Sequence, residues 1–164
     1  MRSKLAWLIV AIGVLGVMGA STATVLATPP VGSSAVALAP VGHFGDINMN
    51  TKYGDWKGKV ETHGDSDMYV TQVTIQPGGS TGWHMHAGPS FVIVKSGTAS
   101  IYQGEDPTCT KQDVQAGGTI FEPAENVHIV RNEGNVPLVN VVVQLVPSGV
   151  ARTISMPDPG NCSF

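Results

Sequence analysis

Apolar and polar residues alternate over short runs through most of the chain after residue 57, and Gly or Pro separates these runs. A period of two places successive side chains on opposite faces of a strand. The enrichment in β-branched and aromatic residues favours strands, with a turn at residues 77–79 and a tight hairpin turn at residues 96–97. The strands predicted in this way are residues 68–76, 90–95, 98–102, 119–122, 127–131 and 138–146.

A helical period is missing from the same part of the sequence. After Thr28, no stretch free of Gly and Pro repeats its apolar residues at the spacing of a helix face. Short strands separated by turn residues are typical of sandwiches and barrels. The sequence therefore predicts an all-β fold.

Residues 1–27 have the pattern of an export signal. Arg2 and Lys4 precede an uncharged apolar stretch, and small residues follow at positions 21–27. The uncharged run is also longer than the roughly 20 residues that span a bilayer, so an uncleaved membrane anchor is the alternative. In either case we expect a secreted or extracytoplasmic domain, which touches a membrane only through an uncleaved N-terminus.

The composition of the remaining chain predicts two parts, a lead and a domain. The first part of residues 28–56 is rich in Pro, Gly, Ala and Ser, which predicts a flexible lead, and residues 57–164 suffice for one domain. Loss of Arg2 and Lys4 with the signal changes the formal charge from -3 to -5. The remaining basic residues are scattered among acidic ones, which argues against nucleic acid as a partner.

The chain has two cysteines, Cys109 and Cys162. An even number of cysteines in an exported chain favours a disulfide, which here would attach residues 156–164 to the barrel. A redox-active or metal-binding thiol pair is the alternative. It is less favoured because neither cysteine has a Cys or His nearby in the sequence.

His84-Met85-His86 is the most informative stretch for function. On a strand, the two imidazoles point to the same face while Met85 points to the other. A third imidazole from another strand, His128, would complete a set of nitrogen ligands that suits iron, copper, nickel or zinc.

The residues around these histidines resemble the two conserved motifs of the cupin superfamily. In the first motif, five residues separate a Gly from His-x-His, and a Glu and a further Gly follow. In the second, Gly, Pro-x-Gly, His and Asn stand at fixed spacing. Ser90 replaces the Glu of the first motif, and Glu125 replaces the second Gly of the other. The matching residues are Gly78, His84, His86, Gly97, Gly117, Pro123, His128 and Asn132.

The resemblance implies a single small jelly-roll β-barrel with a divalent transition metal held by His84, His86 and His128. Iron, manganese, nickel, copper and zinc are all candidates. Ser90, at the position of the family's Glu, and Asn132, which shares the strand parity of His128, are expected next to the ligands as supporting groups, with a turn residue as the alternative for Asn132. A homodimer is an expectation from the family alone.

Glu122 lies close in sequence to the third histidine. It could point into the cavity as a replacement ligand, or act as a general base for an enolisable substrate. A solvated charge at the end of a strand is the alternative.

Two classes of function follow from these features. The first is an oxygenase-like metal enzyme that acts on a small chelating carbonyl or phenolic compound, as the resemblance implies for centres with three histidines. The second is a non-catalytic module that binds a metal or a small ligand. A structural barrel without metal fits less well, because all three histidine positions are filled. Folds of this breadth host many activities, so the motifs name no substrate.

Overall fold

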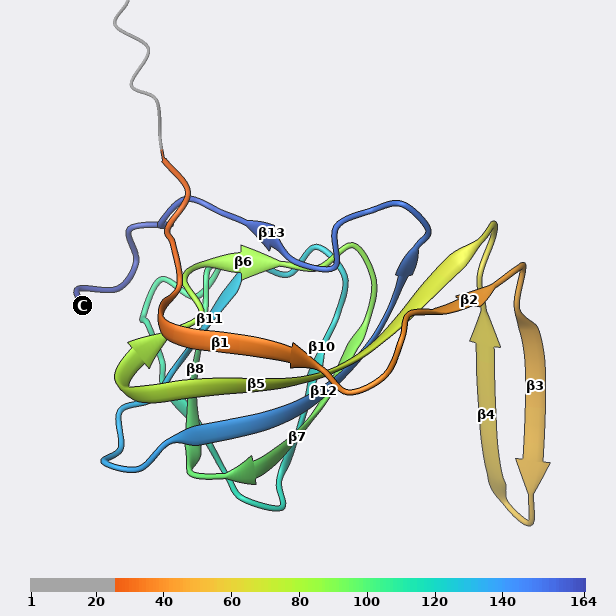
Figure 1. Ribbon diagram of the computed structural model, residues 1–164, viewed down its shortest axis with the longest axis horizontal. Helices are drawn as coiled ribbons and strands as arrows, with labels where there is room; N and C mark the ends of the chain where they lie inside the picture. The colour runs from red at the N-terminus through yellow and green to blue at the C-terminus, as the bar shows by residue number, and fades with distance from the viewer. Residues whose placement is uncertain (1–25) are drawn as a thin grey trace, which may run out of the picture.

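The computed structural model describes residues 26–164, which form thirteen strands and contain no helix (Figure 1). The predicted export segment, residues 1–27, falls almost entirely outside the described residues. In the described part, nothing has the length and apolar character of a membrane-crossing helix. The strands are β1 Val31–Ala37, β2 Gly42–Phe44, β3 Asn48–Tyr53, β4 Trp56–Glu61, β5 Ser66–Ser80, β6 His84–Met85, β7 Ser90–Ser96, β8 Thr98–Gln103, β9 Gln112–Gln115, β10 Thr119–Glu122, β11 His128–Arg131, β12 Leu138–Pro147 and β13 Ile154–Ser155.

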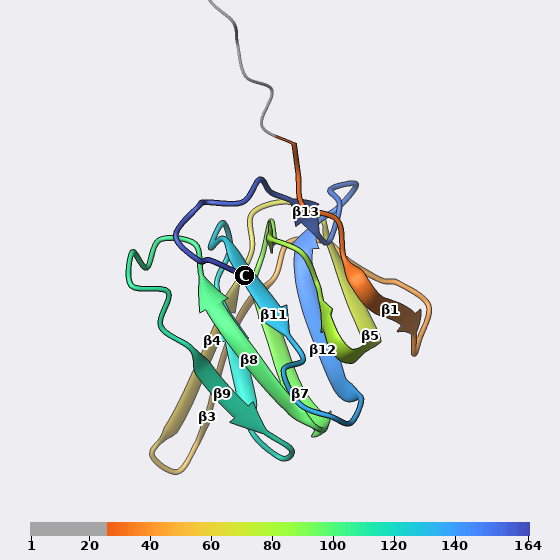
Figure 2. The ribbon, with the colours of Figure 1, turned by 90° about the vertical axis from the view of Figure 1, so that its left-hand side faces the viewer.

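Eleven of these strands belong to one curved sheet, whose two halves face each other (Figure 2). In the first half, β10, β7, β12 and β5 lie side by side, and β1 and β2 pair with β5. The second half contains β9, β8, β11, β6 and β13. The halves meet where Arg131 of β11 pairs with Ser80 of β5, and backbone hydrogen bonds between Asn132 and residues 78–79 extend this contact. This arrangement confirms the predicted all-β jelly-roll barrel.

All six predicted strands are present, but two of the predicted turns differ. Residues 77–79 do not end the strand, because β5 continues to Ser80. Gly78 has a positive φ within β5, so the strand is locally irregular there. Residues 96–97 do not form a hairpin. β7 pairs with β10 and β12, whereas β8 pairs with β9 and β11. At Gly97 the chain crosses from one half of the sheet to the other, and a Cβ there would lie 2.9 Å from Leu138 Cα.

The predicted flexible lead is ordered. β1 pairs antiparallel with β5 from Val31 to Ala37, and β2 pairs with the other end of the same strand. β3 and β4 form a separate hairpin that projects from the barrel (Figure 1). The sequence does not reveal β1 because its residues are almost all exposed, and strand pairing through backbone hydrogen bonds requires no apolar alternation. The domain therefore begins before residue 57.

Apolar side chains from both halves of the sheet fill one end of the barrel. The buried polar groups, which include the three motif histidines, lie at the other end. The apolar cluster contains Ile75, Val94, Ala99, Ile101, Val130 and Leu138.

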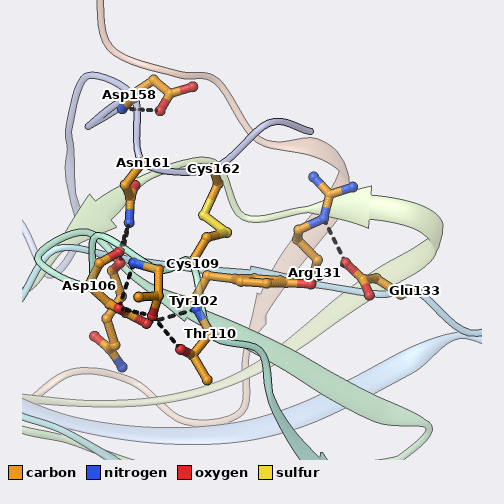
Figure 3. The surroundings of a disulfide bond; sticks show 12 residues. Tyr102, Asp106, Cys109, Thr110, Arg131, Glu133, Asp158, Asn161 and Cys162 are labelled. Carbon is orange, nitrogen blue, oxygen red and sulfur yellow. Dashed lines mark hydrogen bonds and ion pairs between the residues drawn. A yellow bond between two sulfur atoms is a disulfide. The ribbon is translucent and has the colours of Figure 1, made fainter.

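The predicted disulfide is present and attaches the C-terminal tail to the outside of β8 and β11 (Figure 3). The Asn161 side chain donates to the carbonyl groups of Gln103, at 2.9 Å, and Asp106, at 2.6 Å. The tail also packs near Trp83, on the face of the chain opposite the His84 ring. The bridge between Cys109 and Cys162 therefore has the structural role that the sequence favours.

Replacing both cysteines by Ser should lower the free energy of unfolding by about 4 kcal/mol, because the bridge closes a loop of 53 residues in the unfolded chain. Denaturant unfolding of the variant and of the oxidised parent measures this difference. Equal midpoints would show that the bridge does not stabilise the fold.

Candidate metal centre

The strand β6 determines where the first two histidines point. Side chains alternate along this segment, so His84 and His86 face the barrel interior while Trp83 faces the C-terminal tail. His84 is 6% exposed and His86 is 3% exposed. β13 pairs with β6 on its outer edge, with Ser155 opposite His84.

The third histidine comes from the neighbouring strand. His128 begins β11 and lies directly opposite His84 in the antiparallel register. The centroid of the His128 ring is 4.4 Å from that of His84 and 5.3 Å from that of His86. One ring nitrogen from each of the three residues lies within 4.8 Å of the others. The structure thus brings together the three histidines that the motifs single out.

Backbone carbonyl groups orient all three rings. The Nδ1 atom of His84 lies 3.0 Å from the Gly82 oxygen, that of His86 lies 2.8 Å from the Arg152 oxygen, and that of His128 lies 2.9 Å from the Asn126 oxygen. A carbonyl oxygen can only accept, so each Nδ1 that donates to it carries the proton. The Nε2 atoms then keep their lone pairs, which is the form that binds a metal.

Glu122 lies among these Nε2 atoms. Its side chain is buried, with one carboxylate oxygen 3.1 Å from His86 Nε2 and the other 3.3 Å from His128 Nε2. Neither contact has hydrogen-bond geometry, and both Nε2 atoms are buried without a hydrogen-bond partner. The alternative of a solvated charge at the end of a strand is therefore wrong, because Glu122 faces the interior.

Ser90 is the cross-strand neighbour of Glu122. The two residues are paired in the antiparallel ladder of β7 and β10, so their side chains project from the same face of the sheet. Ser90 is completely buried, and its hydroxyl accepts a hydrogen bond of 3.1 Å from the Gln144 side chain. The carboxylate that the first motif lacks at position 90 is thus present on the adjacent strand.

Burial and the neighbouring charges shift the pKa values of the site in opposite directions. Burial, followed by the proximity of His128, lowers the pKa of His84 from 6.5 to about 3. Burial alone would raise the pKa of the Glu122 carboxyl, but His128 and His86 hold it well below its usual range. Burial alone would lower the pKa of His128, but the Glu122 carboxylate raises it. At neutral pH the centre therefore combines a neutral His84 with an ionised Glu122.

The residues fit a divalent transition metal. Two buried Nε2 atoms without a partner are costly in a protein interior, and an ion would remove that cost. Imidazole and carboxylate are ligands of iron, manganese, nickel, copper and zinc, so the donor set does not select one ion. The site opens into a cavity of about 230 Å³ inside the barrel.

Other residues of the motifs lie away from the centre. The Asn132 side chain donates to the carbonyl groups of Ile75 and Val136, both at 2.8 Å, and accepts from the Gly134 amide. These contacts are those of the turn residue that was the alternative, and none of these hydrogen bonds reaches a histidine of the site. Glu125 is exposed and has a positive φ of 61°, which explains why the family usually has Gly there.

Sequence reasoning missed two residues of the site, Gln144 and Arg152. The Gln144 side chain nitrogen lies 2.9 Å from His86 Nδ1, and the Arg152 carbonyl orients the same ring. One signal was available for Gln144: in residues 138–146, polar Asn140 and Gln144 share the parity of the buried apolar positions. Arg152 follows the strand in a loop, where no pattern identifies it.

The depressed pKa of His84 predicts how stability depends on pH. Without metal, the unfolded chain takes up a proton near pH 6.5, which the folded chain does not accept until about pH 3. His84 therefore removes stability as the pH falls between these values, by at most about 1.4 kcal/mol per pH unit. A His84→Gln variant should lose less stability than the parent across this window in denaturant unfolding with a chelator present. Parallel pH profiles would contradict the shift.

Comparison with known proteins agrees with the fold and the motifs. The family model described as a cupin domain matches residues 71–144. A mannose-1-phosphate guanylyltransferase from Salmonella muenchen is 29% identical over 84 residues, which are 50% of this chain and 17% of that protein. The match thus spans about a sixth of this relative.

Solved structures with a similar chain path include a cupin-like protein from Thermotoga maritima, at 21% identity and a TM-score of 0.48, covering 56% of this chain and 65% of the other. A polyketide cyclase from Streptomyces resistomycificus is 22% identical with a TM-score of 0.46, covering 56% and 64%. The family model, the curved all-β sheet and the two histidine motifs together show that residues 71–144 belong to a cupin domain.

Proposed function

We propose that the protein is an exported metal-dependent enzyme, in which His84, His86, His128 and Glu122 hold a divalent transition metal. The observation that carries this proposal is the convergence of Nε2 atoms without a hydrogen-bond partner and a buried carboxylate at one point of the barrel. A redox-active ion would supply Lewis acidity and one-electron chemistry there.

The role proposed for Glu122 follows from charge. Three neutral imidazoles leave the charge of a divalent ion uncompensated, whereas one carboxylate halves it. Ser90 cannot supply that carboxylate, and Glu122 projects from the same face directly across the ladder. Glu122 thus replaces the family's Glu as the fourth ligand. Its second oxygen is then placed to accept a proton from an enolisable substrate.

The cavity next to the centre favours a small substrate. Apolar side chains form much of its wall, including Val73, Val92 and Val142, and these would keep bulk water from the bound compound. The volume of about 230 Å³ suits a compound with a chelating pair of oxygens. We therefore propose oxygenase-like chemistry on a small carbonyl or phenolic compound. The disulfide is compatible with an oxidising compartment outside the cytoplasm.

Metal content provides the first test of these roles. The purified chain, without an affinity tag, should bind one divalent ion per chain, and His84→Ala, His86→Ala or His128→Ala should each abolish binding. Glu122→Ser should weaken binding by at least about 10-fold. Adding Ser90→Glu to that variant returns a carboxylate to the same face and should restore most of the affinity.

Mass spectrometric metal analysis and competition with a chelator measure these affinities, and thermal unfolding confirms that each variant is folded. Glu125→Ser is the matched control, because Glu125 is an exposed carboxylate in the loop that follows Glu122. If Glu122→Ser binds metal as tightly as Glu125→Ser does, Glu122 is not a ligand.

Oxygen consumption separates the enzyme from the non-catalytic alternative. The protein reconstituted anaerobically with iron should consume oxygen in the presence of a diketone, a catechol or a flavonol, and His128→Ala should not. An oxygen electrode measures the rate. Stoichiometric metal without turnover of any such compound would instead identify a module that stores or senses a metal or ligand.

A further inference from the structure

Arg152 connects the loop between β12 and β13 to the proposed centre through its backbone. Its carbonyl oxygen accepts the Nδ1 proton of His86 at 2.8 Å and also lies 3.2 Å from the Gln144 side chain nitrogen. The residue cannot move far without releasing the His86 ring. Its side chain is therefore held close to the site by its own main chain.

Arg152 lines the same cavity as His84 and His86, and its guanidinium group contacts Gln144, which also lines that cavity. One of the guanidinium nitrogens, Nη1, donates to Gln144 Oε1 at 3.1 Å. Within residues 26–164, no carboxylate forms an ion pair with it. Arg131 differs, because it pairs with Glu133 and stacks on the Phe164 ring. A guanidinium group has five N–H donors, so Arg152 keeps donors available for a ligand.

The charge balance of the cavity favours an anionic ligand. The wall contains four ionisable side chains, which are those of His84, His86, Glu122 and Arg152. Glu122 offsets half the charge of a divalent ion, and Arg152 adds a positive charge that no side chain of the wall offsets. A half-buried cation without a partner is unfavourable, and a planar carboxylate is the group that a guanidinium binds best.

We infer that Arg152 determines substrate specificity by binding a carboxylate of the ligand, while a neighbouring pair of the ligand's oxygens chelates the metal. This inference rests on the proposed metal centre and narrows its substrate to small chelating compounds that bear a carboxylate. The Gln144 amide sets the distance between the two binding points, because it contacts both the guanidinium and the His86 ring.

Malonate and acetylacetone test this assignment as a matched pair. Both chelate a metal through two oxygens in a six-membered ring, but acetylacetone has methyl groups where malonate has its two non-chelating oxygens. With zinc-loaded protein, Arg152→Gln should weaken malonate binding about 10-fold or more and change acetylacetone binding little. Arg152→Lys should recover part of the loss, and Arg131→Gln is the control. Calorimetry measures the affinities, and zinc analysis after each titration confirms that the ion stays bound.

Each outcome bears on a different claim. If Arg152→Gln retains zinc and binds malonate as tightly as the parent does, the inference is overturned while the metal centre stands. If the parent binds neither zinc nor any of the other candidate ions, the proposed function fails, and malonate titration of the metal-free protein then decides the inference. If the metal-free parent binds malonate and Arg152→Gln weakens that binding, the inference is supported. If Arg152→Gln binds malonate as tightly as the parent does, or if the parent binds none, the inference is overturned.

Discussion

The hydrogen bonds between backbone carbonyl groups and the three imidazole rings are the constraint on which the site depends. Because a carbonyl oxygen only accepts, each bond fixes the proton on Nδ1 and directs the Nε2 lone pair into the barrel. Two of the carbonyl groups come from residues two positions before their histidine, so they are local. The third belongs to Arg152, which is 66 residues from His86.

That long-range bond makes the C-terminal part of the chain relevant to the centre. β13 follows Arg152 and pairs with β6, the strand that contains His84. The tail beyond β13 is attached to the barrel by Cys162. The disulfide is thus remote from the three histidines, but it lies in the same C-terminal part of the chain as the carbonyl group that orients the His86 ring. A small barrel gains more from such a link than a large domain, because its apolar core occupies only one end.

The position of the carboxylate shows how a β-sheet can preserve chemistry while the sequence changes. In an antiparallel ladder, two directly paired residues share a face, so Glu122 on β10 can project where a Glu at position 90 on β7 would. A motif search scores Ser90 as a departure from the family. The register places a carboxylate on the same face, one strand away. Loss of the motif Glu is therefore a weak argument for loss of metal binding in this chain.

The sequence predicted the strands that cross the barrel core, because their buried faces impose alternation. It also predicted the three histidines and the disulfide. It failed for β1, which is an exposed edge strand, and for the crossing at Gly97, because strand pairing depends on partners distant in the chain. The burial of Glu122 and the role of Arg152 depend on register and loop path, which one sequence does not reveal.

The most direct test of the account is anomalous diffraction from crystals of the metal-loaded protein. We predict one peak inside the barrel, at about 2.0–2.2 Å from the Nε2 atoms of His84, His86 and His128 and from a Glu122 oxygen. A peak bound through Nδ1, or one that Glu122 does not contact, would contradict the assignment of the carboxylate. No peak among the histidines in a fully loaded crystal would refute the metal centre itself.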